Sequence, residues 1–164
     1  MIRPGQAVIL DSGTTTTAIA RACRNMNNLT VITNATNIAA ELADTPVEVI
    51  LTGGVLRNNS YSLVGPLAEE SLRMLSADLF FLGVDGFDLH YGVTTPNLLE
   101  ARVNRVMTES ARRTVVVCDS SKFGKRSLSL IIPIEAVHET ITDKDISRGD
   151  LKALREADVE VTLV

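Results

Sequence analysis

The chain has 164 residues, of which 45% are hydrophobic and 22% are charged, and its formal net charge is −4. This length suits one domain with its own hydrophobic core, and the acidic balance argues against a surface that grips a nucleic-acid backbone by itself. It leaves open a DNA-binding domain outside the chain. No apolar run approaches the ~20 residues of a membrane-spanning helix, so we expect a cytoplasmic protein without a membrane partner.

Short apolar runs alternate with helix-like stretches along almost the whole chain. The first five runs are continuous in Val, Ile, Leu and Phe, which is typical of strands covered on both faces. The predicted strands are Ala7–Leu10, Thr30–Thr33, Glu48–Leu51, Asp78–Leu82, Thr114–Cys118, Glu139–Thr142 and Glu160–Val164. The predicted helices are Thr15–Met26, Thr36–Ala43, Pro66–Leu75, Asn97–Arg112 and a last helix that Ser147 caps and that ends near Glu156.

This alternation predicts one α/β domain over residues 1–164, with a mainly parallel sheet and helices on both faces. The segment from Gly53 to Pro66 is the exception, because its Gly and Asn pairs predict a hairpin or a long loop. Strand-like sequence begins and ends close to the two chain ends, so we expect a domain cut from a longer protein. Cys23 and Cys118 lie in apolar stretches without metal-like spacing and are expected to be buried thiols.

A polar cluster follows each of the first five predicted strands. In a parallel sheet these clusters meet at the carboxyl edge, where open α/β folds bind ligands. The pattern therefore indicates a site for a polar small molecule. The clusters are Asp11–Thr16, Thr33–Asn37, Thr52–Gly54, Asp85–Asp88 and Asp119–Gly124.

The first of these clusters suits a phosphate group. Gly13 lets the backbone approach a ligand closely, and the following helix presents unpaired N–H groups to an anion. Ser12, Thr14, Thr15 and Thr16 can add hydroxyl donors. The alternative is that Ser12 or Thr14 only caps the helix.

The other candidate residues have structural alternatives of equal or greater weight. Asp85 and Asp88 suit sugar hydroxyls or proton transfer, but Asp-Gly is also a common turn pair. Glu100 follows a helix start at which Thr95 is the predicted cap, and it either shields the rim of the core or points into a cleft. Lys122 can neutralise a phosphate, although an exposed loop lysine is the common case.

Two further residue types carry less weight. Arg57, near the Gly-Gly turn, is a weaker anion candidate than Lys122. His90 and His138 are isolated and lack the clustered ligands that a metal site needs, so we expect no metal and no cofactor.

Several stretches together resemble the carboxyl-terminal sensor domain of the DeoR family of bacterial transcriptional regulators. They occur in the same order over nearly the whole chain, and the sequence is most similar to repressors of amino-sugar operons. The matching stretches are Leu10–Thr16, Thr30–Asn34, Leu51–Gly54, Ser62–Pro66, Ala77–Gly83, Gly92–Pro96, Asp119–Gly124 and Ile141–Asp143.

The resemblance implies a fold similar to ribose-5-phosphate isomerase, glucosamine-6-phosphate deaminase and the CoA transferases. It implies a phosphorylated sugar as effector, operator DNA as the partner of an amino-terminal winged helix-turn-helix outside this chain, and a homodimer or homotetramer. It supports Ser12, Gly13, Thr14, Thr15, Thr16 and Lys122 as phosphate-binding residues. It also implies a sugar site lined by Asp11, Asn34, Gly53, Gly54, Asp85, Gly86 and Glu100.

The alternative function is a sugar-phosphate isomerase or deaminase with Glu100 or Asp85 as base. The stretch Asp85–Asp88 resembles the Asp-Gly-Ala-Asp motif of ribose-5-phosphate isomerases. Leu89–Thr94 stands where those enzymes carry a glycine-rich segment with a lysine, which puts enediolate stabilisation in doubt. We therefore expect a regulator rather than an enzyme.

Overall fold

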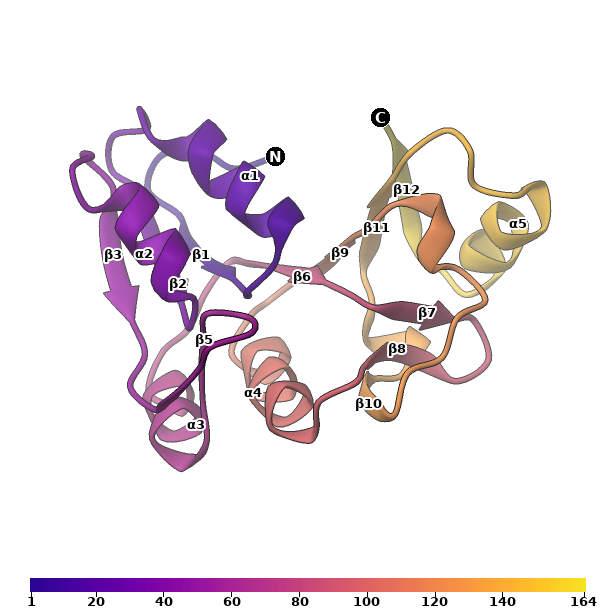
Figure 1. Cartoon of the computed structure of the whole chain (residues 1–164). Helices are drawn as coiled ribbons and strands as arrows, with labels where there is room; N and C mark the ends of the chain where they lie inside the picture. The colour runs from indigo at the N-terminus through magenta and orange to yellow at the C-terminus, as the bar shows by residue number, and fades with distance from the viewer.

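The computed structural model describes all residues from Met1 to Val164. Its centre is a seven-stranded sheet in the order β12-β11-β9-β6-β1-β2-β3, in which every neighbouring pair is parallel (Figure 1). The predicted mainly parallel sheet is thus confirmed. Its strands are β1 (Ala7–Leu10), β2 (Thr30–Thr33), β3 (Glu48–Leu51), β6 (Leu79–Gly83), β9 (Thr114–Val117), β11 (Glu139–Thr142) and β12 (Glu160–Leu163).

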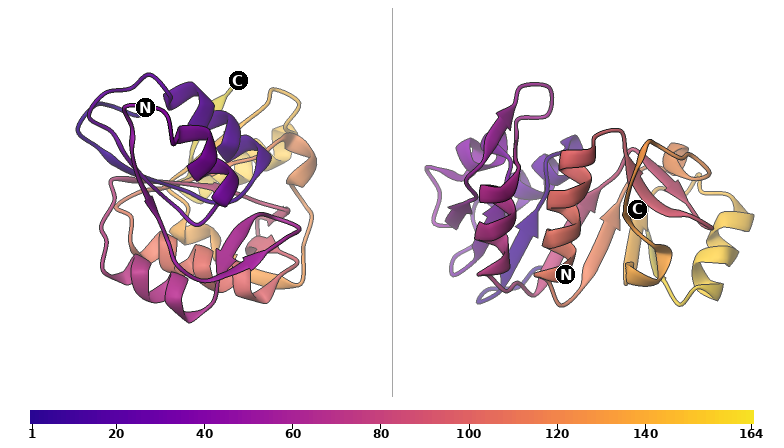
Figure 2. Two further views of the ribbon diagram at one scale, coloured as in Figure 1. Left: turned by 60° about the vertical axis from the view of Figure 1, so that its left-hand side comes forward. Right: turned by 90° about the horizontal axis from the view of Figure 1, so that it is seen from below.

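Helices cover both faces of this sheet, as the alternating pattern predicts (Figures 1 and 2). Ile38 and Leu42 of one helix pack with the buried side chains of β1 and β2 on one face. On the opposite face, Leu72 and Met107 pack with Phe80 of β6. The helices on the first face are α1 (Thr14–Cys23) and α2 (Thr36–Leu42), and those on the second are α3 (Pro66–Arg73) and α4 (Leu98–Glu109).

The order of the strands reverses between β1 and β6. From β1 the chain proceeds outward through β2 to β3, and from β6 it proceeds in the other direction through β9 and β11 to β12. The loops that follow β1 and β6 therefore diverge at the carboxyl edge of the sheet. Such a reversal is the place where open α/β sheets form a ligand crevice.

A smaller antiparallel sheet, which we did not predict, lies beside the main one. It has the order β10-β8-β7 and packs Phe87, Val93 and Ile131 into the same core as α4. Its strands are β7 (Gly86–Asp88), β8 (Gly92–Thr95) and β10 (Ser129–Ile132).

The segment between β3 and α3 forms a hairpin, which confirms one of the two predicted alternatives. Strands β4 (Val55–Arg57) and β5 (Ser62–Val64) pair antiparallel, with Arg57 opposite Ser62. Residues 58–61 form its tip. Tyr61 has a φ of 55°, which is uncommon for a residue other than glycine.

Helix starts differ in how well they were predicted. The cap of α5 (Arg148–Glu156) is confirmed, because the Ser147 Oγ accepts a hydrogen bond from the Asp150 amide. The predicted cap of α4, Thr95, is wrong: Asn97 caps the helix, and its Oδ1 accepts hydrogen bonds from the amides of Leu99 and Glu100.

Two short 3₁₀ helices, η1 (Ser120–Lys122) and η2 (Ile134–Ala136), complete the fold. None of the helices combines the length and the apolar character that crossing a membrane requires.

Candidate functional site

The loops that follow β1, β6 and β9 enclose a cleft of about 300 Å³ at the point where the strand order reverses. We call it the switch-point cleft. Its walls are Ser12–Thr15, Gly83–Asp85, Val117–Asp119 and Lys122. Three of the five predicted loops therefore meet here. Five of the six predicted phosphate-binding residues line the cleft, and only Thr16 does not: they are Ser12, Gly13, Thr14, Thr15 and Lys122.

The loop from Ser12 to Thr15 ends in the amino terminus of α1, and no side chain caps this helix. Its N-cap residue is Gly13 in an extended conformation, so neither Ser12 nor Thr14 fills the capping role that was the alternative interpretation. Uncapped N–H groups at a helix start carry partial positive charge and bind anions. The exposed Thr14 and Thr15 lie beside them.

Two threonine hydroxyls brace this loop from below. The Thr16 Oγ1 donates to the Asp11 carbonyl at 2.9 Å, and the Thr17 Oγ1 donates to the Gly13 carbonyl at 2.6 Å. Thr16 is completely buried, so its hydroxyl holds the shape of the loop and does not line the cleft.

Asp11 lies beneath the loop and is almost fully buried. Its Oδ2 accepts a hydrogen bond from the Gly83 amide at 3.0 Å, while its Oδ1 has no partner. Burial raises the pKa of this carboxyl to about 7, because an anion is poorly solvated there. Asp11 thus ties the end of β1 to the end of β6 and does not face the solvent in the cleft.

The wall that carries Lys122 is held by two carboxylates. The Asp119 Oδ1 accepts from the Ser121 amide at 2.9 Å, and the Asp143 Oδ2 accepts from the Ser120 amide at 2.7 Å. Hydrogen bonds from Ser121 and Ser120 keep the pKa values of Asp119 and Asp143 below their usual range. These anions fix η1, and η1 places Lys122 opposite the loop after β1.

The acidic pair after β6 serves two purposes. Asp85 lines the switch-point cleft, and its Oδ2 accepts from the Thr95 hydroxyl at 2.9 Å. Asp88 instead accepts from the amides of His90 and Tyr91, which is the turn alternative. Gly86 lies outside the cleft in a crowded place, where an added Cβ would approach the Lys125 carbonyl to 2.6 Å.

A second cleft, of about 480 Å³, lies on the other side of the same loop. We call it the hairpin cleft, because Asn59, Ser60 and Tyr61 at the hairpin tip form one wall. Asn37 and Arg21 from the helices form another, and the two clefts share Ser12–Thr14. Asn37 belongs to the predicted polar cluster Thr33–Asn37, whereas Arg21 and the hairpin-tip residues were not predicted.

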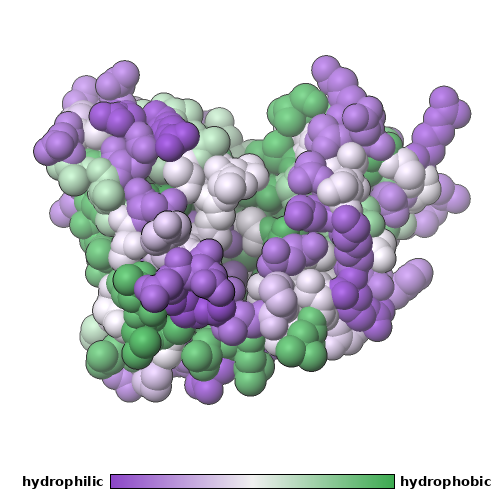
Figure 3. Space-filling model, viewed as in Figure 1, coloured by the Kyte–Doolittle hydropathy of each residue, from purple (hydrophilic) through white to green (hydrophobic).

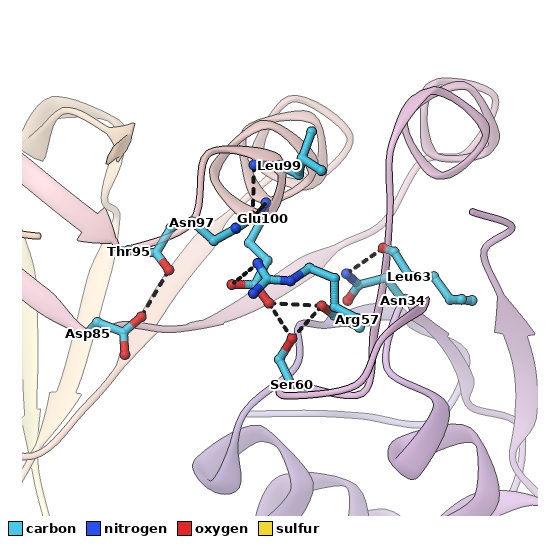
Figure 4. Close-up of polar contacts among 10 residues, drawn as sticks. Asn34, Arg57, Ser60, Leu63, Asp85, Thr95, Asn97, Leu99 and Glu100 are labelled. Carbon is cyan, nitrogen blue, oxygen red and sulfur yellow. Dashed lines mark hydrogen bonds and ion pairs between the residues drawn. The ribbon is translucent and has the colours of Figure 1, made fainter. Parts of the chain in front are cut away.

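Glu100 lies in neither cleft but behind the hairpin tip, at the start of α4 (Figure 4). Its Oε1 accepts hydrogen bonds from the hydroxyls of Ser60 and Ser62, and its Oε2 lies 3.4 Å from an Arg57 guanidinium nitrogen. The side chain is 14% exposed. Three polar side chains of the hairpin, those of Arg57, Ser60 and Ser62, therefore meet around one largely buried carboxylate.

Asn34, Gly53 and Gly54 also lie outside both clefts, next to the hairpin. The Asn34 Nδ2 donates to the Leu63 carbonyl at 3.0 Å (Figure 4). Gly54 has a φ of 128°, and an added Cβ would lie 2.7 Å from the Val64 carbonyl oxygen. Asn34 thus ties β5 to the end of β2, and Gly54 lets the two strands of the hairpin approach closely.

The largest hollow of the surface is an apolar groove of about 590 Å³ between α1 and the ends of β11 and β12. Figure 3 shows apolar atoms in the recess between these two parts of the molecule. Most of its lining residues are hydrophobic, which does not suit a sugar phosphate, so we place the candidate site in the two polar clefts.

Both cysteines are free and buried, as predicted. No group of three or more His, Cys, Asp or Glu side chains in the structure could hold a metal ion.

Solved structures show what this fold is similar to. Ribose-5-phosphate isomerase A from Methanocaldococcus jannaschii matches 77% of the chain and 50% of its own length, with a TM-score of 0.55 and 14% identity. eIF2B beta from Chaetomium thermophilum matches 85% of the chain and 44% of its own length, with a TM-score of 0.52 and 15% identity. The predicted similarity to the isomerase fold is confirmed, and at these identities it concerns the fold alone.

Sequence comparisons give a narrower result. Residues 1–144 match the family described as "DeoR C terminal sensor domain". A protein of Escherichia coli O157:H7 named "Putative aga operon transcriptional repressor" is 48% identical over the whole chain, which spans 61% of that relative's length. The transcriptional regulator GlpR of Haloferax volcanii is 39% identical over 96% of the chain and 62% of its own length.

Proposed function

Because the chain belongs to the family of DeoR C-terminal sensor domains, we propose that it is the effector-binding part of a sugar-responsive transcriptional repressor. The proposed effector is a phosphorylated sugar, of which an amino-sugar phosphate is the leading candidate. The observation that carries this proposal is the uncapped amino terminus of α1, which opens into a polar cleft opposite Lys122. A cytoplasmic location follows from the proposed role.

The phosphate group is placed on the loop Ser12–Thr15. Backbone N–H groups and the Thr14 and Thr15 hydroxyls supply donors, and Lys122 supplies a positive charge from the opposite wall. Asp85 and Asp119 line the same cleft, where each already accepts a hydrogen bond, from the Thr95 hydroxyl and from the Ser121 amide respectively. The neutral form of Asp11 is favoured beneath an anion, and its raised pKa makes that form accessible near neutral pH.

Operator DNA is the proposed partner of the complete protein. The curated relatives are named as transcriptional regulators and are longer than this chain, which spans 61–62% of the first two. We propose that an amino-terminal winged helix-turn-helix supplies the DNA contacts and that the sensor domain assembles as a dimer or tetramer. Effector binding would shift the equilibrium between assemblies with different DNA affinity, which requires different effector affinity in the two states.

We further propose that the domain does not turn over its ligand. A general base must reach the proton that it removes, whereas Glu100 lies behind the hairpin tip and already accepts hydrogen bonds from Ser60 and Ser62. Asp85, the other candidate base, is exposed and hydrogen-bonded to Thr95. Neither carboxylate has a lysine opposite it in the position of the isomerase motif.

Calorimetry with inorganic phosphate, ribose 5-phosphate, glucosamine 6-phosphate and N-acetylgalactosamine 6-phosphate tests the proposal. We expect at least one sugar phosphate to bind, and to bind more tightly than the same sugar without phosphate. The same samples, assayed for turnover, should show none. Absence of binding to every member of the panel by a folded domain, or turnover that Glu100→Gln abolishes, would contradict the proposed function.

A further inference from the structure

We propose that the hairpin cleft is the subsite that recognises the sugar ring of the effector, and that Glu100, Arg57 and Asn34 are positioning residues which hold its hairpin wall. This inference rests on the proposed function, because it assumes that the phosphate lies on the loop shared by the two clefts. It assigns sugar recognition to Asn37, Asn59 and Tyr61.

The first argument is the contrast in charge between the two clefts. The switch-point cleft is lined by Asp85, Asp119 and Lys122. The only charged residue that lines the hairpin cleft is Arg21, whose guanidinium lies 3.0 Å from Glu41 outside the cleft. An uncharged, hydroxyl-rich ring therefore finds amide and hydroxyl partners in the hairpin cleft without an unpaired charge beside it.

The second argument is the chemistry of the lining side chains. The Asn37 Nδ2 donates to the Thr17 hydroxyl at 2.9 Å, but the Asn37 Oδ1 is buried without a partner. Because Asn37 lines the cleft, a rotation of its amide turns the Oδ1 toward the ligand, whose hydroxyl or acetamido N–H then supplies the missing donor. Tyr61 is 58% exposed as a residue, and an aromatic face packs well against the C–H face of a sugar.

The third argument is that the backbone at Tyr61 is held in place from outside the cleft. Its φ of 55° costs free energy for a non-glycine residue and persists only where neighbouring contacts enforce it. The Tyr61 carbonyl accepts hydrogen bonds from both the amide and the hydroxyl of Thr36. Ser60 and Ser62, on either side of it, both donate to Glu100.

Three residues predicted to line the sugar site thus act on the hairpin. Asn34 holds Leu63, Gly54 lets the backbone pass close to Val64, and Glu100 holds Ser60 and Ser62. Arg57 pairs with Glu100 from the first strand of the hairpin. Asn34, Gly54 and Glu100, which the family resemblance implies as sugar-site residues, therefore support the hairpin wall of the cleft. The wall itself is formed by Asn59, Ser60 and Tyr61, which the resemblance did not include.

The test compares two kinds of ligand, sugar phosphates and inorganic phosphate, on the same variants. Tyr61→Asn removes the ring but keeps a residue that tolerates positive φ, and Tyr91→Asn is the matched control at the other tyrosine, which lies under the Arg126 guanidinium. Affinities are measured by calorimetry for N-acetylgalactosamine 6-phosphate and glucosamine 6-phosphate, and by competition for inorganic phosphate.

We expect Tyr61→Asn to bind the sugar phosphates about tenfold more weakly, with the affinity for inorganic phosphate unchanged within twofold. Tyr91→Asn should match the wild type for both ligands. Glu100→Ala frees the hairpin tip and, like Tyr61→Asn, should weaken the binding of the sugar phosphates but not that of inorganic phosphate. Glu100→Gln keeps an acceptor for the two serines and should restore part of the sugar-phosphate affinity.

Two results would overturn the inference while the proposed function stands. The first is wild-type sugar-phosphate affinity in Tyr61→Asn, and the second is an equal loss for sugar phosphates and inorganic phosphate in both Tyr61→Asn and Glu100→Ala. A wild-type domain that binds none of the sugar phosphates contradicts the proposed function itself, and the subsite with it.

Discussion

The two clefts on either side of the loop Ser12–Thr14 are built from different chemistry. The switch-point cleft is formed by the ends of parallel strands and gathers two carboxylates and Lys122. The hairpin cleft is formed by the tip of an added hairpin and by helix residues, and its polar groups are nearly all uncharged. Under the proposed function, the parallel sheet supplies the anion site, and the hairpin beside it supplies the wall that contacts the sugar ring.

The largest expected effect comes from placing a negative charge on the shared loop. Thr14→Glu puts a carboxylate at the first residue of α1, where it favours the helix dipole but repels a phosphate. We expect the affinity for every sugar phosphate to fall on the order of a hundredfold by calorimetry, with no loss of thermal stability. Thr14→Gln is the neutral control. Equal sugar-phosphate affinities of the two variants would show that the phosphate does not bind at this loop.

A smaller effect is expected from the buried carboxyl beneath the loop. Burial raises the pKa of native Asp11 from 3.8 to about 7, so the native chain holds a proton that the unfolded chain has released between these values. Stability attributable to Asp11 therefore falls as the pH rises through this window, and the loss is complete above about pH 7.

The Asp11→Asn variant does not titrate at this position. Its free energy of unfolding, relative to the wild type, should rise by roughly 2–3 kcal/mol between pH 5 and pH 8. Urea unfolding of both proteins at the two pH values measures this difference. A difference that does not depend on pH would mean that Asp11 is ionised in the native state throughout, and that it is a fixed anion beside the phosphate loop.

The smallest effect tests the charge contrast between the clefts. Lys122→Ala removes the only cation that lines the switch-point cleft, and we expect about tenfold weaker sugar-phosphate binding that becomes less sensitive to salt. Lys125→Ala, at an exposed lysine outside both clefts, is the control and should leave the affinity unchanged. Equal behaviour of the two variants would show that Lys122 does not reach the ligand.

The parallel sheet was largely predictable because the first five of its strands along the chain are rich in continuous apolar residues and alternate with helix-like stretches. β1, β2, β3 and β11 begin and end where the sequence pattern places them. The strands of the small antiparallel sheet were not predicted, because β7 and β8 are short and include Gly and Thr, which are also typical of turns. Their packing against α4 depends on tertiary contacts that no local pattern contains.

The candidate site was predictable in part for the same reason. Ser12–Thr15, Asp85 and Lys122 follow strands of one sheet, and topology alone brings them together. The role of Glu100 could not be read from its position, because its hydrogen-bond partners Ser60 and Ser62 are 40 and 38 residues away in the sequence. Tyr61 carried no signal beyond a polar turn, and Asn37 was part of the polar cluster after the second strand but had no feature of its own that marked it as a ligand contact.

The most direct test of the central claim is a titration of the wild-type domain with a sugar phosphate, followed through the backbone amide resonances. If the phosphate lies on the uncapped start of α1, the amides of Gly13, Thr14 and Thr15 shift most strongly. The same sugar without phosphate leaves these three amides unchanged. Saturable binding that shifts other amides but not these would contradict the account.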